Sequence, residues 1–294
     1  MKPASFDYHA PETLAPALDL LAKYGDTARP LAGGQSLVPL MNFRLLRPSH
    51  LVDLNGVREL NYLRVENGEL KIGAMTRQRR LERSSDGAEQ WPLLREATSY
   101  IGHIQVRNRG TVGGSLAHAF PSAELPVAMV ALGASFVLRR KNSERTARAE
   151  DFFLSHMTTV LQADELLVEI RVPALPPDTG WSSREVSRRH GDFALAGVAS
   201  LVTLDAAGMM TRARLTLTGE TPIRAVKAEE LVLGQKPSET LFREAARRAV
   251  EGLEQDSDIH ASAEYRRNAC EVLTRRAWAE AAKRSADLAK GISR

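Results

Sequence analysis

The sequence predicts an α+β fold on three observations. Short strand candidates alternate with helix candidates in the first 55 residues, and successive strand candidates follow a proline-rich run at residues 173–180. Nearly everything after Lys227 has a helical pattern. Strands that are followed by a separate set of helices are typical of α+β proteins. The chain has 294 residues, of which 43% are hydrophobic and 26% charged, so it can bury a sizeable core.

The first segment is predicted to be a small β–α–β–α–β unit. Apolar residues recur at helical spacing between residues 12 and 24, at Leu14, Ala17, Leu18 and Leu21. Strands are expected at "ARPLA" (28–32) and "HLVDL" (50–54). Between them Ser36 can cap a helix whose first turn tolerates Pro39.

A second segment begins near Asn61. Its expected strands are "ELKIGA", "ASFVLRR" and "ELLVEIRVP". Its expected helices are "RQRRLERS", capped by Thr76, "WPLLREATSYIG", and "ELPVAMVALG", which ends at Gly133.

The run "PALPPDTG" at 173–180 has three prolines in eight residues and predicts a domain boundary. The expected division is 1–176, with subdomains of about 1–57 and 58–176, followed by 177–294. Beyond the boundary, "WSSREVSRR", "LAGVASLVTLD" and "MTRARLTLTG" predict a small antiparallel sheet, with "DAAGM" as a turn. Helices are expected at 227–233, 238–253 and 262–285.

The composition of the chain argues against several classes of function. The net charge is only +4 and aromatic residues are 5%, so basic clusters at 77–80 and 139–141 indicate solvated surface rather than a nucleic-acid interface. With Cys270 alone, the chain has no internal disulfide and no cysteine-only iron–sulfur cluster of its own. Since no run of about 18 apolar residues occurs, we expect no membrane span and a cytoplasmic location.

Hydrolytic and metal chemistry also lack support. The seven histidines show no ligand spacing such as H-E-x-x-H, so no metal site is expected. Ser122 and His118 lie close in sequence, but no G-x-S-x-G motif accompanies them. A loop histidine bonded to backbone groups is the simpler interpretation of His118.

Two glycine-rich stretches carry the functional signal: "AGGQS" (32–36) and "GTVGGS" (110–115). Successive glycines let backbone N–H groups converge on an anion, and two such nests can hold one diphosphate from both sides. Tight turns without a ligand are the alternative. Neither stretch fits G-x-G-x-x-G or a P-loop, so a Rossmann site or a P-loop is not supported.

Three separated motifs closely resemble the FAD-binding medium subunit of molybdenum hydroxylases, the relatives of carbon monoxide dehydrogenase, xanthine dehydrogenase and aldehyde oxidase. They are "AGGQSLVPLMNFR", "IGHIQVRNRGTVGGSLAHAFPSAELP" and "SRRHGDFALAGVA". The resemblance covers essentially the whole chain. It implies a two-subdomain, vanillyl-alcohol-oxidase-like FAD-binding domain, followed by a small antiparallel sheet with helices.

The resemblance also implies residue roles, and it implies no catalytic side chain. The first loop is expected to wrap the FAD diphosphate, through Ala32, Gly33, Gly34, Gln35 and Ser36. The second is expected to face the cofactor, through Thr111, Val112, Gly113, Gly114 and Ser115. Glu124 is expected near the adenosine ribose. Leu167 is expected to make an apolar contact to the flavin or the adenine, and Arg184 a basic contact near the flavin. Backbone neighbours of the cofactor are expected at Ile101 and Gly110.

The sequence departs from the family pattern at three positions, two of which are expected site residues. Phe120 stands where relatives often have Asp, which puts local hydrogen bonding in doubt. Glu124 replaces a frequent Asp, and Val112 replaces a frequent Ile. One branch of the family carries a four-cysteine iron–sulfur loop, which a chain with one cysteine cannot have.

The resemblance implies an electron-transfer subunit. FAD would take electrons from the [2Fe–2S] clusters of a small subunit, while a large molybdopterin subunit oxidises the substrate. The expected assembly is an (LMS)2 heterohexamer, which contains two copies each of the large, medium and small subunits. NAD, oxygen, quinone or a protein is expected as the electron acceptor. Asp192 is expected either to tune the flavin potential or to cap a turn. The alternatives are a free-standing FAD-dependent oxidase or dehydrogenase, and a nucleotide-binding module that has lost FAD.

Overall fold

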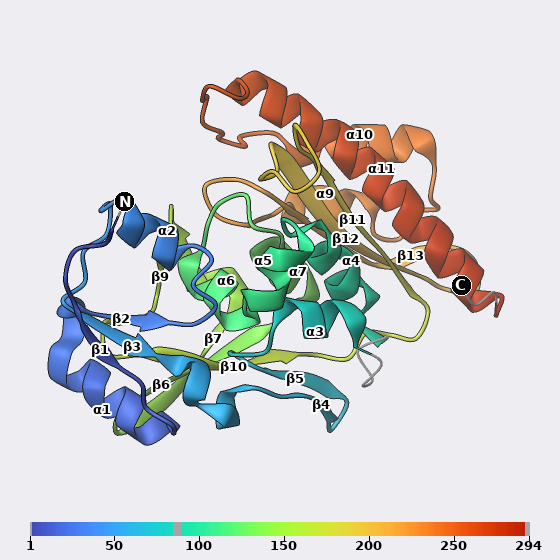
Figure 1. Ribbon diagram of the computed structural model, residues 1–294. Coiled ribbons are helices and arrows are strands. Elements are labelled where there is room, and N and C mark those ends of the chain that lie inside the picture. The colour runs from blue at the N-terminus through green and yellow to red at the C-terminus, as the bar shows by residue number, and fades with distance from the viewer. Residues whose placement is uncertain (1, 85–89, 292–294) are drawn as a thin grey trace.

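Three sheets and their helices follow one another along the chain in the computed structural model, which describes residues 2–84 and 90–291 (Figure 1). A three-stranded parallel sheet comes first and a five-stranded antiparallel sheet second. A four-stranded antiparallel sheet comes third, with the longest helix packed along it. Both helices and sheets are therefore present in an α+β arrangement, as predicted.

The first sheet is the predicted β–α–β–α–β unit. Its strands are β1 (Asp7–His9), β2 (Ala28–Leu31) and β3 (His50–Asp53), in the order β1-β3-β2. The connecting helices are α1 (Leu14–Tyr24) and α2 (Leu37–Asn42), and the short 3-10 turns are η1 (Gly25–Thr27), η2 (Leu54–Gly56) and η3 (Arg58–Leu60). The predicted apolar face of α1 is buried against this sheet. The glycine loop at 32–36 therefore leaves the carboxyl end of a parallel strand and enters α2.

The five-stranded sheet has the order β4-β5-β10-β6-β7, and all its pairs are antiparallel. Its strands are β4 (Leu63–Glu66), β5 (Glu69–Gly73), β6 (Ser135–Arg140), β7 (Ser143–Arg148) and β10 (Leu166–Val172). Its helices are α3 (Gln78–Arg83), α4 (Pro92–Tyr100), α5 (Ile104–Arg109), α6 (Val112–His118), α7 (Glu124–Leu132) and α8 (Ala149–Phe152), and a small hairpin pairs β8 (Phe153–Ser155) with β9 (Thr158–Thr159). Because β10 is central, six of its seven residues are buried.

The four-stranded sheet lies between two layers of helices. Its strands are β11 (Thr179–Val186), β12 (Ala196–Leu204), β13 (Met210–Leu217) and β14 (Ile223–Arg224), and its helices are α9 (Val226–Val232), α10 (Glu239–Ala249) and α11 (Ala263–Ala289). On β12, Val198 and Val202 pack into the core with α9, α10 and α11, whereas Ala199 and Leu201 join the core of the central helices. This alternation makes the sheet a shared wall, because successive strand residues face opposite sides.

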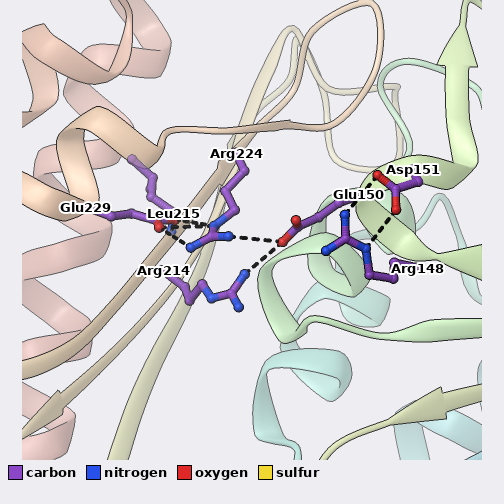
Figure 2. Close-up of polar contacts among 7 residues, drawn as sticks. All are labelled: Arg148, Glu150, Asp151, Arg214, Leu215, Arg224 and Glu229. Carbon is purple, nitrogen blue, oxygen red and sulfur yellow. Dashed lines mark hydrogen bonds and ion pairs between the residues drawn. The ribbon is translucent and has the colours of Figure 1, made fainter.

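An ion-pair network ties this sheet to the central part of the chain (Figure 2). Glu150 of α8 accepts hydrogen bonds from Arg214 at 2.9 Å and from Arg224 at 3.2 Å. Arg224 also pairs with Glu229 at 2.6 Å, and Glu229 accepts the Leu215 N–H. The strands β13 and β14 are thereby held against α8.

Two predicted helix caps are wrong in detail. Thr76 does not cap α3, because its hydroxyl donates to the Tyr62 carbonyl at 2.7 Å and Arg77 occupies the cap position. Ser36 does occupy the cap position of α2, but its side chain makes no capping hydrogen bond. The sequence also did not resolve strands β4 and β7 or helix α5 as elements. Among the described residues, no helix is long and apolar enough to cross a membrane.

Gly180 lies where strand β11 comes close to the backbone of helix α11. A Cβ added there would lie 2.5 Å from the Ser285 backbone nitrogen and closer still to the Ala281 carbonyl oxygen of α11. We expect Gly180→Ala to lower the free energy of unfolding by about 1–3 kcal/mol, because neither backbone group can move without shifting the helix.

Urea denaturation of the purified chain measures this effect. Ser182→Ala is the control, because its buried hydroxyl has no hydrogen-bond partner among the described residues and its loss should be nearly neutral. Equal stability of the two variants would contradict the close contact of α11 with β11.

Candidate functional site

The first glycine loop offers a row of unused backbone donors. No protein acceptor within the described residues bonds the N–H groups of residues 33–37. The carbonyls of Gly34 and Ser36, in contrast, accept the first bonds of α2. Gly34 has φ +74°, a left-handed conformation that glycine adopts without strain. Consecutive unpaired N–H groups in a tight loop are a binding site for an anion.

The second loop, between α5 and α6, differs from the prediction of a second amide nest. Val112 and Gly113 donate their N–H groups to the carbonyls of Thr76 and Ala74, both at 2.9 Å. Gly114 N–H donates to the Thr111 hydroxyl at 3.0 Å, and Ser115 N–H donates to the Thr111 carbonyl at 3.1 Å. These amides anchor α6 to the segment after β5. The second loop can therefore offer shape and hydroxyl groups, but not these four amides.

The two loops touch each other, although they lie almost 80 residues apart in sequence. A Cβ at Gly33 would lie 2.8 Å from the Gly110 Cα and closer to the Arg109 carbonyl oxygen. A Cβ at Gly114 would lie 3.4 Å from the Ala32 Cβ. Residues with side chains cannot replace Gly33 without separating the loops.

A chain of hydrogen bonds that the sequence did not predict clamps the loops together. The Asn55 amide donates to the Ala32 carbonyl at 3.0 Å and accepts from Arg77 at 2.7 Å. Arg77 also donates to the carbonyl of Arg109. Arg77 was expected to be solvated surface, but it is half-buried, and burial and the charge of Arg109 lower its pKa. The Arg77 guanidinium thus places positive charge beside the first glycine loop, and the charge of Arg109 acts on Arg77.

The third motif also reaches this region. The ring of Phe193 lies 4.4 Å from that of Phe120, centroid to centroid, and His190 lies 6.0 Å from His103. Where relatives often have an Asp, this chain therefore has an aromatic contact between the second and third motifs. His118 stacks on Phe120 at 6.3 Å, and burial and the nearby His156 lower its pKa.

Asp192, for which two roles were open, forms a long ion pair with Arg188 at 4.0 Å. Its own N–H donates to the Arg189 carbonyl at 3.1 Å, so it belongs to a local turn. This arrangement is compatible with the turn role, and the role in tuning the flavin potential stays a prediction.

Glu124 and Arg184 line one small pocket between α7 and the four-stranded sheet, together with Glu185, which the sequence did not single out. Burial raises the pKa of Glu124 to about 7. Burial and then the charge of Glu124 raise the pKa of Glu185 to about 8. The buried Arg184 Nε has no hydrogen-bond partner among the described residues. The pocket thus holds two carboxyl groups with raised pKa values and one guanidinium nitrogen without a partner.

Two further predicted contact residues, Leu167 and Ile101, are buried, and their contacts to the cofactor stay predictions. The Leu167 side chain belongs to the core of the five-stranded sheet. The Ile101 carbonyl accepts a hydrogen bond from Arg107 at 2.8 Å, and Arg107 pairs with Glu82. The structure therefore gathers the two glycine loops at one place and Glu124 with Arg184 at another.

A loop of unpaired amides beside two arginines, followed by a separate sheet-and-helix layer, defines a protein that binds a diphosphate-containing cofactor. Residues 4–175 match the family described as the FAD binding domain in molybdopterin dehydrogenase, and residues 181–281 match the CO dehydrogenase flavoprotein C-terminal domain. The chain belongs to this family: it is the FAD-binding subunit of a multi-subunit molybdenum hydroxylase, an oxidoreductase.

Relatives that match over nearly their whole length are subunits of dehydrogenases. The chain is 44% identical to the 6-hydroxypseudooxynicotine dehydrogenase complex subunit alpha of Paenarthrobacter nicotinovorans, with 97% of each chain covered. It is 41% identical to the caffeine dehydrogenase subunit beta of Pseudomonas sp., again with 97% of each covered. The structure of carbon monoxide dehydrogenase from Hydrogenophaga pseudoflava superposes with a TM-score of 0.94 at 38% identity, covering 97% of this chain and 99% of that one.

The Glu124–Glu185 pair predicts pH-dependent stability. The folded pKa values lie above the usual carboxyl value of 4.5, so the folded state retains protons that the unfolded state loses. The contribution of this pair to the free energy of unfolding of the FAD-free chain should be greatest below about pH 4.5 and should fall as the pH rises toward 8. We expect Glu185→Gln to flatten this fall and to be more stable than wild type above pH 8 by about 1–2 kcal/mol.

Urea midpoints measured from about pH 5 to about pH 9, a range that spans both raised pKa values, test this expectation. Exposed Glu244→Gln is the matched control and should follow the wild-type curve. A Glu185→Gln curve that is parallel to wild type across the range would refute the raised pKa of Glu185 in this pocket.

Asn55 holds the two loops together but is not one of the predicted cofactor contacts. Its loss should nevertheless weaken the binding of FAD. Asn55→Ala removes the bonds to Ala32 and Arg77, at about 1 kcal/mol each, and should weaken FAD binding by about tenfold. Isothermal titration with FAD measures the affinity. Asn61→Ala is the control, because its exposed side chain makes no hydrogen bond among the described residues; an equal loss in both variants would show that the clamp is unimportant.

Proposed function

We propose that this chain binds FAD across its two glycine loops and passes electrons from the [2Fe–2S] clusters of a small subunit to an external acceptor. The observation that carries the proposal is the row of five unpaired amides at residues 33–37, held beside Arg77 and Arg109. FAD fits this site because its diphosphate is the anion that such donors bind.

Each predicted site residue then has a defined role. The amides of residues 33–37 would hold the diphosphate, and the hydroxyls of Thr111 and Ser115 would face the cofactor from the opposite loop. Glu124 and Arg184, which line one pocket, would contact the ribose and flavin ends respectively. When bound, FAD supplies a carrier that accepts electrons one at a time and releases them singly or in pairs. No side chain is proposed as an acid–base catalyst.

The remaining parts of the proposal concern the assembly. We propose an (LMS)2 complex with a large molybdopterin subunit and a small [2Fe–2S] subunit. The medium-chain relatives of carbon monoxide dehydrogenase support such a complex for this chain. The domain boundaries near residues 57 and 176 are part of the same proposal, supported by the separate sheets on either side. NAD, oxygen and quinone are the acceptors to be compared, and the cytoplasmic location stays a prediction from the sequence.

Purification of the chain with its associated subunits tests this function. We expect yellow protein with one FAD per chain, iron and molybdenum in the complex, and no oxidase activity from the chain alone. FAD-dependent turnover by the isolated chain would favour a free-standing oxidase, and colourless protein that FAD cannot reconstitute would refute the proposal. Steady-state rates of the complex with each acceptor identify the physiological one.

Gly34→Ala tests the amide loop directly. Alanine at φ +74° costs about 1–2 kcal/mol, and its Cβ would lie 3.2 Å from Val38 Cγ2. We therefore expect FAD affinity to fall about tenfold. Gly234→Ala is a matched control, since Gly234 also has φ +74° but a Cβ added there would meet no atom within 4 Å. Fluorescence titration with FAD compares the two, and equal affinities would exclude the loop from the site.

A further inference from the structure

The outermost strand of the first sheet, β1, is tied to its neighbour by a tyrosine that the sequence did not single out (Figure 1). In the parallel pair of β1 with β3, Tyr8 lies opposite Leu51. It therefore lies on the same side of the sheet as Asp53, two residues further along β3. The Tyr8 hydroxyl donates a hydrogen bond to Oδ2 of Asp53. This hydrogen bond raises the pKa of Tyr8, so the phenol keeps the proton that it donates.

Asp53 uses its other oxygen on Asn55, the residue that clamps the two glycine loops. Oδ1 of Asp53 accepts the Asn55 backbone N–H at 2.9 Å and also an N–H of the Asn55 side chain. Burial raises the pKa of Asp53, but the hydrogen bonds from Tyr8 and Asn55 outweigh burial and lower it, so the carboxylate is ionised. Because an ionised carboxylate only accepts hydrogen bonds, it determines which end of the Asn55 amide carries the donors. The amide nitrogen therefore faces the Ala32 carbonyl at 3.0 Å, and the amide oxygen faces Arg77 at 2.7 Å.

The Ala32 carbonyl and the Gly33 N–H belong to one planar peptide unit. In a trans peptide unit the C=O and the N–H point in opposite directions. A hydrogen bond that holds the Ala32 carbonyl therefore also aims the Gly33 N–H, which is the first of the five unpaired amides. The direction of this donor is thus controlled from β1, through Tyr8, Asp53 and Asn55.

A carboxylate at this place is otherwise unfavourable for the proposed ligand. The diphosphate of FAD is an anion, and like charges repel. Asp53 is near enough to the second loop for the charge of Arg109 to act on it. Orientation of the clamp, not attraction of the ligand, explains an acidic residue here.

We propose that Tyr8 and Asp53 are positioning residues for FAD, which hold the Asn55 amide so that the Gly33 N–H points at the diphosphate. Neither residue touches the cofactor, and both act through Asn55. This inference rests on the proposed function.

Tyr8→Phe removes only the hydroxyl group. Fluorescence titration of the FAD-free full chain with FAD measures the affinity, and we expect a loss of about fivefold, the usual effect of one hydrogen bond. Tyr265→Phe is the matched control, because Tyr265 is 48% exposed, similar to Tyr8 at 56%, and its hydroxyl makes no hydrogen bond among the described residues. The control should bind FAD as wild type does.

Asp53→Glu keeps the negative charge and displaces the carboxyl group by one methylene. The three hydrogen bonds of Asp53 then lose their geometry, and FAD affinity should fall about tenfold. Asp205→Glu is the matched control: Asp205 also accepts the N–H two residues ahead, that of Ala207, at 2.9 Å, but it lies in the turn between β12 and β13. Its substitution should leave FAD affinity unchanged.

Two further measurements distinguish positioning from a general loss of stability. Phosphorus NMR of bound FAD should show the diphosphate resonances displaced in Tyr8→Phe in the same direction as in Asn55→Ala, whereas destabilisation alone would only reduce the bound fraction. In the double variant of Tyr8→Phe with Asn55→Ala, FAD affinity should equal that of Asn55→Ala alone, because the path from Tyr8 to the loop is already broken.

Two outcomes overturn the positioning role while FAD binding is intact. One is full additivity of the two losses in the double variant. The other is wild-type affinity with unchanged phosphorus resonances in both Tyr8→Phe and Asp53→Glu. Failure of the wild-type chain to bind FAD would instead overturn the proposed function, and it is observed before any variant is compared.

Discussion

The contact between Gly33 and the Arg109–Gly110 backbone is the constraint on which the rest of the site depends. Because no side chain fits between these segments, the two glycine loops meet at van der Waals distance. The first loop then keeps its amides unpaired, while the second uses its own to fix α6 against the segment after β5. The first loop thus keeps donors free for a ligand, while the amides of the second serve the fold. Asn55 and Arg77 add the polar links that hold this arrangement.

The four-stranded sheet completes the site from the other side. Its β12 strand contributes to two hydrophobic cores at once, so the sheet cannot shift without disturbing both. The Glu150 network fixes the same sheet at its β13–β14 edge. This rigidity explains how Glu185 is held near Glu124 with both carboxyl groups partly deprived of water. The energetic cost of that pair in the FAD-free chain is consistent with a pocket made for a polar ligand.

The apolar α2 segment has a different status from the glycine loops, although it directly follows one of them. Its exposed side chains, Val38, Phe43 and Leu45, do not stabilise the isolated chain, and among the described residues Arg44 and Arg47 form no ion pair. Such a surface is consistent with a subunit that works inside a complex, as the relatives of this chain do.

Local pattern determined most of the elements of this protein. Helical spacing predicted α1, α4, α7 and α10, and Gly133 predicted the end of α7, because these signals lie within a few residues of one another. The glycine loops were found for the same reason. Tertiary structure decided that Val112 and Gly113 lose their free amides, since their acceptors, Thr76 and Ala74, lie almost 40 residues away in sequence. It also decided that Arg77 and Asn55 join the site, that Glu185 faces Glu124, and that Leu167 lies in the core. Hydrogen bonds and burial between distant segments leave no periodic trace in the sequence, so only the folded chain reveals them.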